Sequence, residues 1–167
     1  MPKYVLDSNI FIQSANREYR FSFCSGFWDL LQDLYQNDVI CSIKTVKREL
    51  TQRNDDLSDW VKNKLPNNFF HNELVAGDEY GRLMQWANDN LQFSDSAKEI
   101  FANEDRADAW LVAYAAKQGM TVVTHEVLEP YIRRAIKIPN AAQHLSVPCV
   151  HIYDFLEDVA KGNFERK

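Results

Sequence analysis

The chain has 167 residues, of which 46% are hydrophobic and 26% are charged, with only 5 glycines and 5 prolines. This composition is typical of a single folded domain spanning residues 1–167, and it excludes a disordered tail or a linker. The formal net charge of -5 argues against a protein that coats nucleic acid through bulk charge, but it is compatible with an enzyme that gathers acids at one metal site.

Targeting, membrane and cysteine signals are weak in this sequence. The first residues contain no basic segment followed by an apolar core, and no apolar run approaches the roughly 18 residues that span a bilayer. We therefore expect a soluble, cytoplasmic protein without a membrane partner. Cys24, Cys41 and Cys149 are widely spaced and form no Cys-x-x-Cys pair, which favours buried thiols over disulfides or a zinc site.

Short apolar runs and amphipathic stretches alternate through the first half of the chain. Apolar residues at helical spacing predict helices, and short buried runs predict strands. The predicted elements are a strand over residues 4–6, a helix over 21–35, a strand over 39–42, a helix capped by Ser42 that runs to about residue 53, and a helix over 56–65. Residues 66–72 read as a loop by composition.

The second half continues the same alternation. The predicted elements are helices over residues 78–91, 94–102 and 105–118, a strand over 120–126, a short helix over 131–136, a loop over 137–148, a strand over 149–152 and a closing helix over 153–160. Gly119 is a typical stop for the third of these helices. Strands that are short apolar runs between helices indicate an α/β fold, with a short central parallel sheet in a three-layer α/β/α arrangement.

Acidic residues stand at the ends of two predicted strands. Asp7 follows the first strand and Glu126 ends the strand over residues 120–126. Ligands of open parallel sheets bind beyond the carboxyl ends of the strands. If both strands belong to one parallel sheet, both carboxylates emerge at the same edge.

Two further segments place acids beside apolar helical stripes. Asp108 shares a stripe with Leu111, Val112 and Ala115, and Asp105 lies one turn earlier. Taken alone, each acid could be a helix-start residue favoured by the helix dipole or a partner of a nearby arginine.

Glu49 also borders the inward stripe of its helix, between Val46 and Leu50. Two carboxylates about 5 Å apart repel by roughly 3 kcal/mol at an effective dielectric of ~20, so four converging acids need compensation. Oxygen ligands alone favour hard ions such as Mg²⁺ or Mn²⁺. Such sites serve phosphoryl transfer, because the metal activates water and neutralises charge on the phosphate.

Four segments carry a family resemblance. "YVLDSN", the glutamate in "TVKREL", "ADAWLVAYA" and "VVTHE", in this order, resemble the PIN-domain nucleases and particularly the VapC-like toxins, over about residues 4–155. The resemblance implies an acidic quartet of Asp7, Glu49, Asp108 and Glu126. It also implies that the small polar residues Ser8, Asn9 and Thr124 orient these acids. The family often has Asp where this chain has Glu126, which leaves the fourth metal ligand open. Glu126 binds the ion directly or through water, or Asp105 takes its place or holds a second ion.

The same resemblance implies a Mg²⁺- or Mn²⁺-dependent endoribonuclease that leaves a 5′-phosphate and a 3′-hydroxyl. It also implies the toxin of a toxin-antitoxin pair, inhibited by an antitoxin peptide in the active-site groove and dimeric through its early helices. The aromatic-rich helix with Phe23, Phe27 and Trp28 is a candidate for the dimer surface, and the alternative is that these side chains belong to the core. Two alternatives remain: an RNA-processing nuclease without an antitoxin, and a non-catalytic binding member of the fold.

Basic residues cluster near two of the candidate acids. Phosphate contacts to the RNA substrate are expected from Lys44, Lys47, Arg48, Arg133 and Arg134, with Tyr131 or Trp110 available for base stacking. The alternative for each lysine or arginine is a solvated helix face that balances nearby acids.

Overall fold

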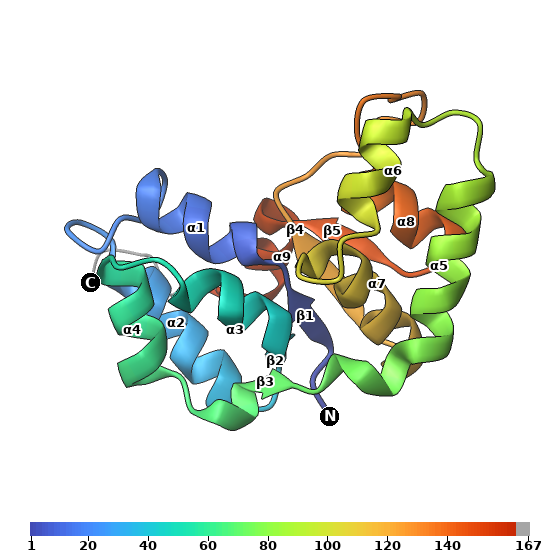
Figure 1. The fold of residues 1–167 in the computed structure, drawn as a ribbon. Helices are drawn as coiled ribbons and strands as arrows, with labels where there is room; N and C mark the ends of the chain where they lie inside the picture. Colours follow the sequence, from blue (N-terminus) through green and yellow to red (C-terminus); the bar gives the residue numbers. More distant parts are fainter. Residues whose placement is uncertain (163–167) are drawn as a thin grey trace.

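A five-stranded parallel sheet forms the centre of the computed structural model, which describes residues 1–162 (Figure 1). Its strands are β1 (Tyr4–Leu6), β2 (Ile40–Ile43), β3 (Phe70–His71), β4 (Thr121–Thr124) and β5 (Cys149–His151). They lie in the order β3-β2-β1-β4-β5, and each neighbouring pair is parallel. The carboxyl ends of all five strands therefore face the same edge of the sheet.

The central strand is buried on both faces. Val5 pairs with Cys41 of β2 and with Val122 of β4, and every residue of β1 and β2 is buried. A continuous apolar run is expected of a parallel strand covered on both sides. From the start of β1 onward, the first charged side chain is therefore Asp7, directly after the central strand ends.

Helices cover both faces of the sheet, and Figure 1 shows α3 and α7 in front of it and α2 and α9 behind it. The helices are α1 (Ser8–Asn16), α2 (Ser25–Gln36), α3 (Lys44–Thr51), α4 (Asp56–Lys64), α5 (Gly77–Asp89), α6 (Asp95–Phe101), α7 (Ala107–Gln118), α8 (Ile138–His144) and α9 (Ile152–Val159), with two 3-10 turns, η1 (Asn67–Phe69) and η2 (Glu73–Ala76). The predicted three-layer α/β/α class is confirmed. No helix within residues 1–162 is long and apolar enough to cross a membrane.

The N-terminal half departs from the predicted elements in three places. Helix α1 begins directly after Asp7, because burial of Ile10 and Phe11 stabilises a segment without strong helix signals. Helix α2 begins at Ser25 rather than at residue 21. The predicted loop over residues 66–72 contains η1 and β3, since Phe70 is buried beside β2.

The predicted cap of α3 is also wrong. Ser42 lies in β2 and donates its hydroxyl to the carbonyl oxygen of Leu6 at 2.7 Å. The helix start is capped instead by the buried carboxylate of Glu73, which accepts the backbone N–H of Thr45 at 2.9 Å. A residue from η2 thus supplies the acceptor that the local sequence lacks.

Two further predictions are wrong in the segment that follows β4. Residues 131–136 are not helical, because the amide of Ser94 donates to the carbonyl of Arg133 at 2.8 Å and the Gln92 side chain donates to the carbonyls of Pro130 and Ile132. Helix α8 then occupies residues predicted as a loop, with a proline in its first turn.

The buried apolar side chains of the described residues form one cluster. Trp28 lies at its aromatic end, stacked on Phe21 at a ring-centroid distance of 4.2 Å and edge-on to Phe27 and Trp60. Phe27 and Trp28 are 0% and 2% exposed, so this part of α2 belongs to the core of the protomer. Of the three side chains expected to form a dimer surface, only Phe23 is exposed.

Candidate active site

Asp7 is held at the carboxyl end of the central strand by contacts from the neighbouring strand. Its backbone N–H donates to the carbonyl of Val123, and its side chain is 0% exposed. Thr124 donates its hydroxyl to Asp7 Oδ2 at 3.0 Å, and Ser8 makes a longer contact of 3.4 Å with Oδ1. The predicted orienting role of Ser8 and Thr124 thus has a geometric basis.

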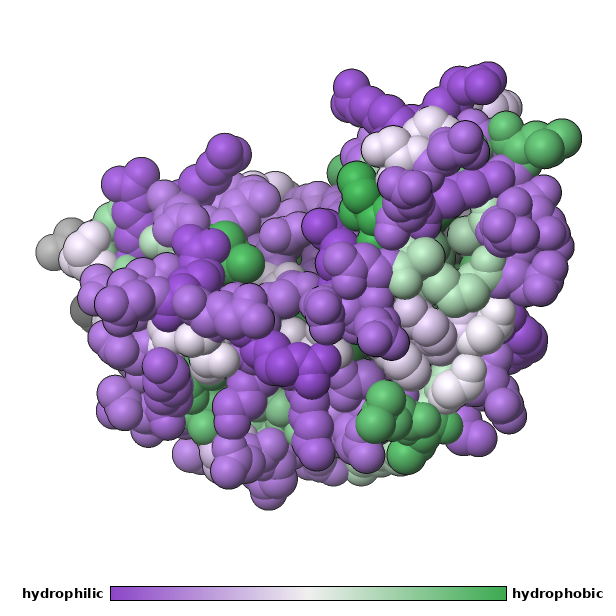
Figure 2. Space-filling view, in the orientation of Figure 1, coloured by the Kyte–Doolittle hydropathy of each residue, from purple (hydrophilic) through white to green (hydrophobic). Residues whose placement is uncertain are grey.

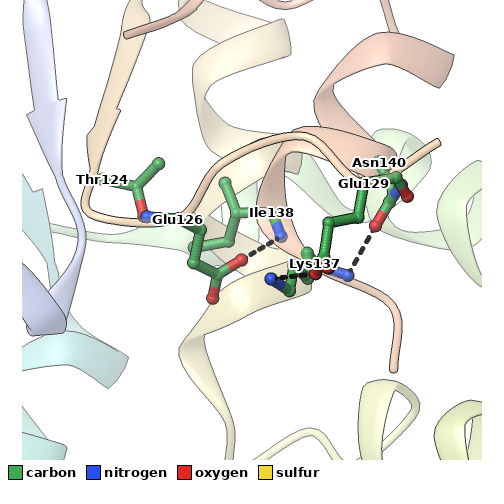
Figure 3. Close-up of polar contacts among 6 residues, drawn as sticks. All are labelled: Thr124, Glu126, Glu129, Lys137, Ile138 and Asn140. Carbon is green, nitrogen blue, oxygen red and sulfur yellow. Dashed lines mark hydrogen bonds and ion pairs between the residues drawn. The ribbon is translucent and has the colours of Figure 1, made fainter. Parts of the chain in front are cut away.

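Thr124 also fixes the start of the segment that carries Glu126. Its hydroxyl oxygen accepts the backbone N–H of Glu126 at 3.1 Å. Glu126 Oε2 in turn accepts the backbone N–H of Ile138, the first residue of α8, at 2.8 Å (Figure 3). One oxygen of Glu126, Oε2, is therefore used to cap a helix, and none of the hydrogen bonds of the described residues uses Oε1.

Glu49 performs a similar task between two other helices. Its Oε1 on α3 accepts the backbone N–H of Ala107, the first residue of α7, at 2.8 Å. Asp108 is the next residue of α7. The contact therefore fixes two of the predicted acids relative to each other, although they are far apart in the chain.

The charges of the other three predicted acids act on Asp7. Burial raises the pKa of Asp7 well above its ordinary value, and the charges of Asp108, Glu126 and Glu49 raise it further, whereas the Thr124 hydrogen bond lowers it. Burial, Glu126 and Glu49 raise the pKa of Asp108 to about 7, against a lowering effect of Arg106. Carboxylates from three other segments thus act on Asp7 at the carboxyl edge of the sheet, and two of them also act on Asp108.

The pKa of Glu126 is subject to opposing effects. Burial raises its pKa, while the N–H of Ile138 and the cations Lys137 and Arg106 lower it. Lys137 is held by an ion pair with Glu129 in the same connection (Figure 3). Two cations therefore act on Glu126, and one of them, Arg106, also acts on Asp108.

Within residues 1–162, no group of three or more His, Cys, Asp or Glu side chains is arranged so that it could coordinate a metal ion. The donor set fits a hard divalent ion nevertheless, because all donors are carboxylate oxygens and the two glutamates each keep one oxygen beyond their helix caps. Water molecules can complete the coordination of such an ion.

Two predicted acid-site residues lie apart from this group. Asp105 is exposed, and the charges that act on Asp108 come from Glu126, Arg106 and Glu49 rather than from Asp105. Asn9 is exposed on α1, and none of the hydrogen bonds of the described residues joins it to Asp7.

The five basic residues predicted to bind RNA lie in different places relative to the acidic quartet. On α3, Lys44 is exposed, Arg48 donates to Thr45 Oγ1 at 3.1 Å, and Lys47 donates to Asn67 Oδ1 at 2.5 Å, so Lys47 points to η1. Arg133 and Arg134 are both exposed. Only Arg134 of this set lines the pocket beside Asp108 and Glu126.

That pocket has a volume of about 200 Å³ and lies between α6 and the β4–α8 connection. Its apolar side consists of Ala97, Ile100, Phe101 and Ile136, and its cationic side of Arg106, Arg134 and Lys137. Figure 2 shows the molecule hollowed at its upper edge, between the parts that carry α1 and α6 in Figure 1.

Sequence reasoning did not identify Arg106 or α6 as parts of the site. The available signal for Arg106 was its position immediately before the helix that carries Asp108. No local pattern marks the α6 wall, because Ile100 and Phe101 come beside the acids only through packing.

The fold and site together define an α/β protein whose parallel sheet presents a carboxylate cluster and an adjoining cationic pocket at its carboxyl edge. The chain belongs to the family described as "Domain of unknown function (DUF4411)", which matches residues 4–161. No curated protein and no solved structure matches the chain.

Proposed function

We propose that this protein is a metal-dependent endoribonuclease of the PIN type that hydrolyses RNA phosphodiester bonds. The observation that carries the proposal is the convergence of Asp7, Glu49, Asp108 and Glu126, from four separate segments, at the carboxyl edge of a parallel sheet. These are the acids that the resemblance to PIN-domain nucleases assigns to the catalytic quartet. Burial and the charges of Asp108, Glu126 and Glu49 raise the pKa of Asp7, and a strongly shifted buried carboxyl of this kind is typical of functional sites.

The proposed cofactor is Mg²⁺ or Mn²⁺. Asp7 and Asp108 would hold it, with Glu49 and Glu126 completing the site directly or through water. When bound, such an ion supplies an activated water and offsets the negative charge that builds on the phosphate oxygens. The cation also relieves the repulsion among the acids, which explains why a folded protein tolerates them together.

The remaining residues of the site have separate tasks in this proposal. Thr124 orients the carboxylate of Asp7, and the helix caps made by Glu49 and Glu126 fix their positions. Arg106 and Arg134 line the pocket beside the acids, where guanidinium groups bind phosphate oxygens. Arg106 and Arg134 thus place positive charge beside the acidic quartet, where the RNA strand has to bind, although the chain as a whole is negatively charged.

A direct test is incubation of the purified protein with total RNA, with and without Mg²⁺ or Mn²⁺. We expect cleavage only with the ion, loss of cleavage in Asp108→Ala, and loss of cleavage with retained RNA binding in Asp7→Asn. Asp105→Ala is a matched control, because it removes an exposed acid from the same part of the chain. Equal cleavage by wild type and Asp7→Asn in Mg²⁺ would refute the proposal.

We further propose that the nuclease is the toxin of a toxin-antitoxin pair, since the resemblance is strongest to VapC-like toxins. Expression of wild type in a bacterial host should arrest growth, and expression of Asp7→Asn should not. Growth arrest should be relieved by co-expression of the protein encoded next to this chain. Active cleavage without growth arrest would favour an RNA-processing nuclease, and no Mn²⁺ binding by calorimetry would favour a non-catalytic member of the fold.

A further inference from the structure

We propose that the pocket between α6 and the β4–α8 connection is a nucleobase subsite that receives one unpaired nucleotide of the RNA strand beside the acidic quartet. This inference rests on the proposed function, because it assigns a place to the substrate of that reaction. It adds residues that contact the base rather than the phosphate being cleaved.

The chemistry of the pocket lining matches the parts of a nucleotide. Ile100, Phe101 and Ile136 form an apolar wall for a planar ring, and Arg106 and Arg134 supply cations for the phosphate. Asp108 and Glu126 belong both to the pocket lining and to the acidic quartet. A base in the pocket therefore places its own phosphate next to the proposed cleavage centre.

The size of the pocket limits what it can hold. Its volume is about 200 Å³, below the range of roughly 300–1,000 Å³ that is usual for sites of drug-sized ligands and cofactors. A single ring system is therefore a better match than a whole dinucleotide. Base-paired RNA does not fit this geometry, because its bases are stacked and directed inward, so the strand has to be unpaired at this point.

The wall formed by the β4–α8 connection is fixed before any ligand binds. The amide of Ser94 donates to the carbonyl of Arg133, and Gln92 donates to the carbonyls of Pro130 and Ile132 at 2.8 Å. Farther along, Glu126 accepts the N–H of Ile138. A preformed wall lowers the ordering cost of binding, so even a mononucleotide should bind.

The test is the affinity of the wild-type protein, without metal, for AMP and for ribose 5-phosphate, measured by ligand-observed NMR. These probes contain no phosphodiester bond, so their binding is independent of hydrolysis. We expect AMP to bind about tenfold or more tightly than ribose 5-phosphate, with the largest saturation transfer at the adenine protons. Equal affinities would show a phosphate site without a base subsite and would overturn the proposal.

Two matched pairs of variants locate the base. Ile100→Ser should weaken AMP binding at least fivefold, whereas Leu91→Ser, at a position that is 91% exposed and outside the pocket, should not change it. Arg134→Gln should weaken both probes, whereas Arg82→Gln should leave both unchanged, because Arg82 is an exposed arginine of α5 that does not line this pocket. Equal effects within each pair would refute the assignment.

The outcomes separate this inference from the proposed function. Nucleotide binding at the pocket without RNA cleavage would disprove the nuclease and keep the subsite. RNA cleavage without preferential AMP binding would keep the nuclease and disprove the subsite.

Discussion

Thr124 donates its hydroxyl to Oδ2 of Asp7 across 3.0 Å, and this bond joins two residues that are 117 positions apart in the chain. Both residues follow or end central strands of the sheet, and both are fully buried. Because the bond lowers the pKa of Asp7 against the effect of burial, it favours the charged form that binds a cation.

Replacement of Thr124 by Val should therefore affect both stability and ionisation. The variant leaves a buried carboxyl without its donor, and we expect the free energy of unfolding to fall by about 1–3 kcal/mol. The pKa of Asp7 should rise further, which NMR titration of the side-chain carboxyl carbon measures. Thr124→Ser keeps the hydroxyl and should stay close to wild type, and a Val variant with unchanged stability and pKa would contradict the role of this bond.

Glu49 has two roles that two substitutions can separate. Glu49→Gln keeps an oxygen acceptor for the N–H of Ala107 but removes a charge of the quartet, so it should retain stability and lose RNA cleavage. Glu49→Ala removes the helix cap as well, and we expect it to lower the free energy of unfolding by about 1 kcal/mol. Denaturant unfolding and cleavage assays, read together, check both expectations. Full cleavage by the Gln variant would show that the charge is not needed.

The raised pKa values of Asp7 and Asp108 predict a stability that declines with pH. The folded protein binds these protons more tightly than the unfolded chain, whose aspartates titrate near ~4. Without metal, the melting temperature should therefore fall as pH rises from about 4 through the pKa of Asp108 at about 7. Thermal unfolding between pH 5 and pH 8 in a chelator measures this decline.

The same experiment includes its control and a metal arm. Asp108→Asn should flatten the decline, whereas Asp105→Asn, which alters an exposed acid, should not. Mn²⁺ at pH 8 should raise the melting temperature of wild type and leave that of Asp7→Asn unchanged. A wild-type stability that increases over this pH range would contradict the raised pKa values.

Glu73 should act on the site through the position of α3. Its buried carboxylate caps the helix at Thr45, four residues before Glu49. Glu73→Ala should lower the free energy of unfolding by about 1–2 kcal/mol and reduce cleavage, because the helix that holds Glu49 loses its N-terminal acceptor. Asp78→Ala, an exposed acid at the start of α5, is the comparison. Equal free energies of unfolding for the Glu73→Ala and Asp78→Ala variants would contradict the capping role of Glu73.

Local patterns predicted most of the elements correctly where one signal dominates. Tyr4–Leu6 is a short apolar run that ends in a charge, and α7 is a long apolar helix that ends before Gly119, which adopts a φ of 69°. The patterns failed at α1 and β3, which depend on burial of Phe11 and Phe70 against distant elements. They failed again over residues 131–136, where hydrogen bonds from Gln92 and Ser94 hold an irregular segment in place of the predicted helix.

The sequence by itself determined the alternation of buried strands and helices and the position of Asp7 directly after the first strand. Asp7 and Glu126 share one edge because β1 and β4 pair in parallel, which the structure established. Only the tertiary structure decided that Glu49 caps the helix of Asp108, that Asp105 lies apart, and that Arg106 and α6 form a pocket beside the acids. The physical reason is that periodicity and caps are local properties of the chain. Contacts between residues tens of positions apart depend on how the layers pack, which no local pattern specifies.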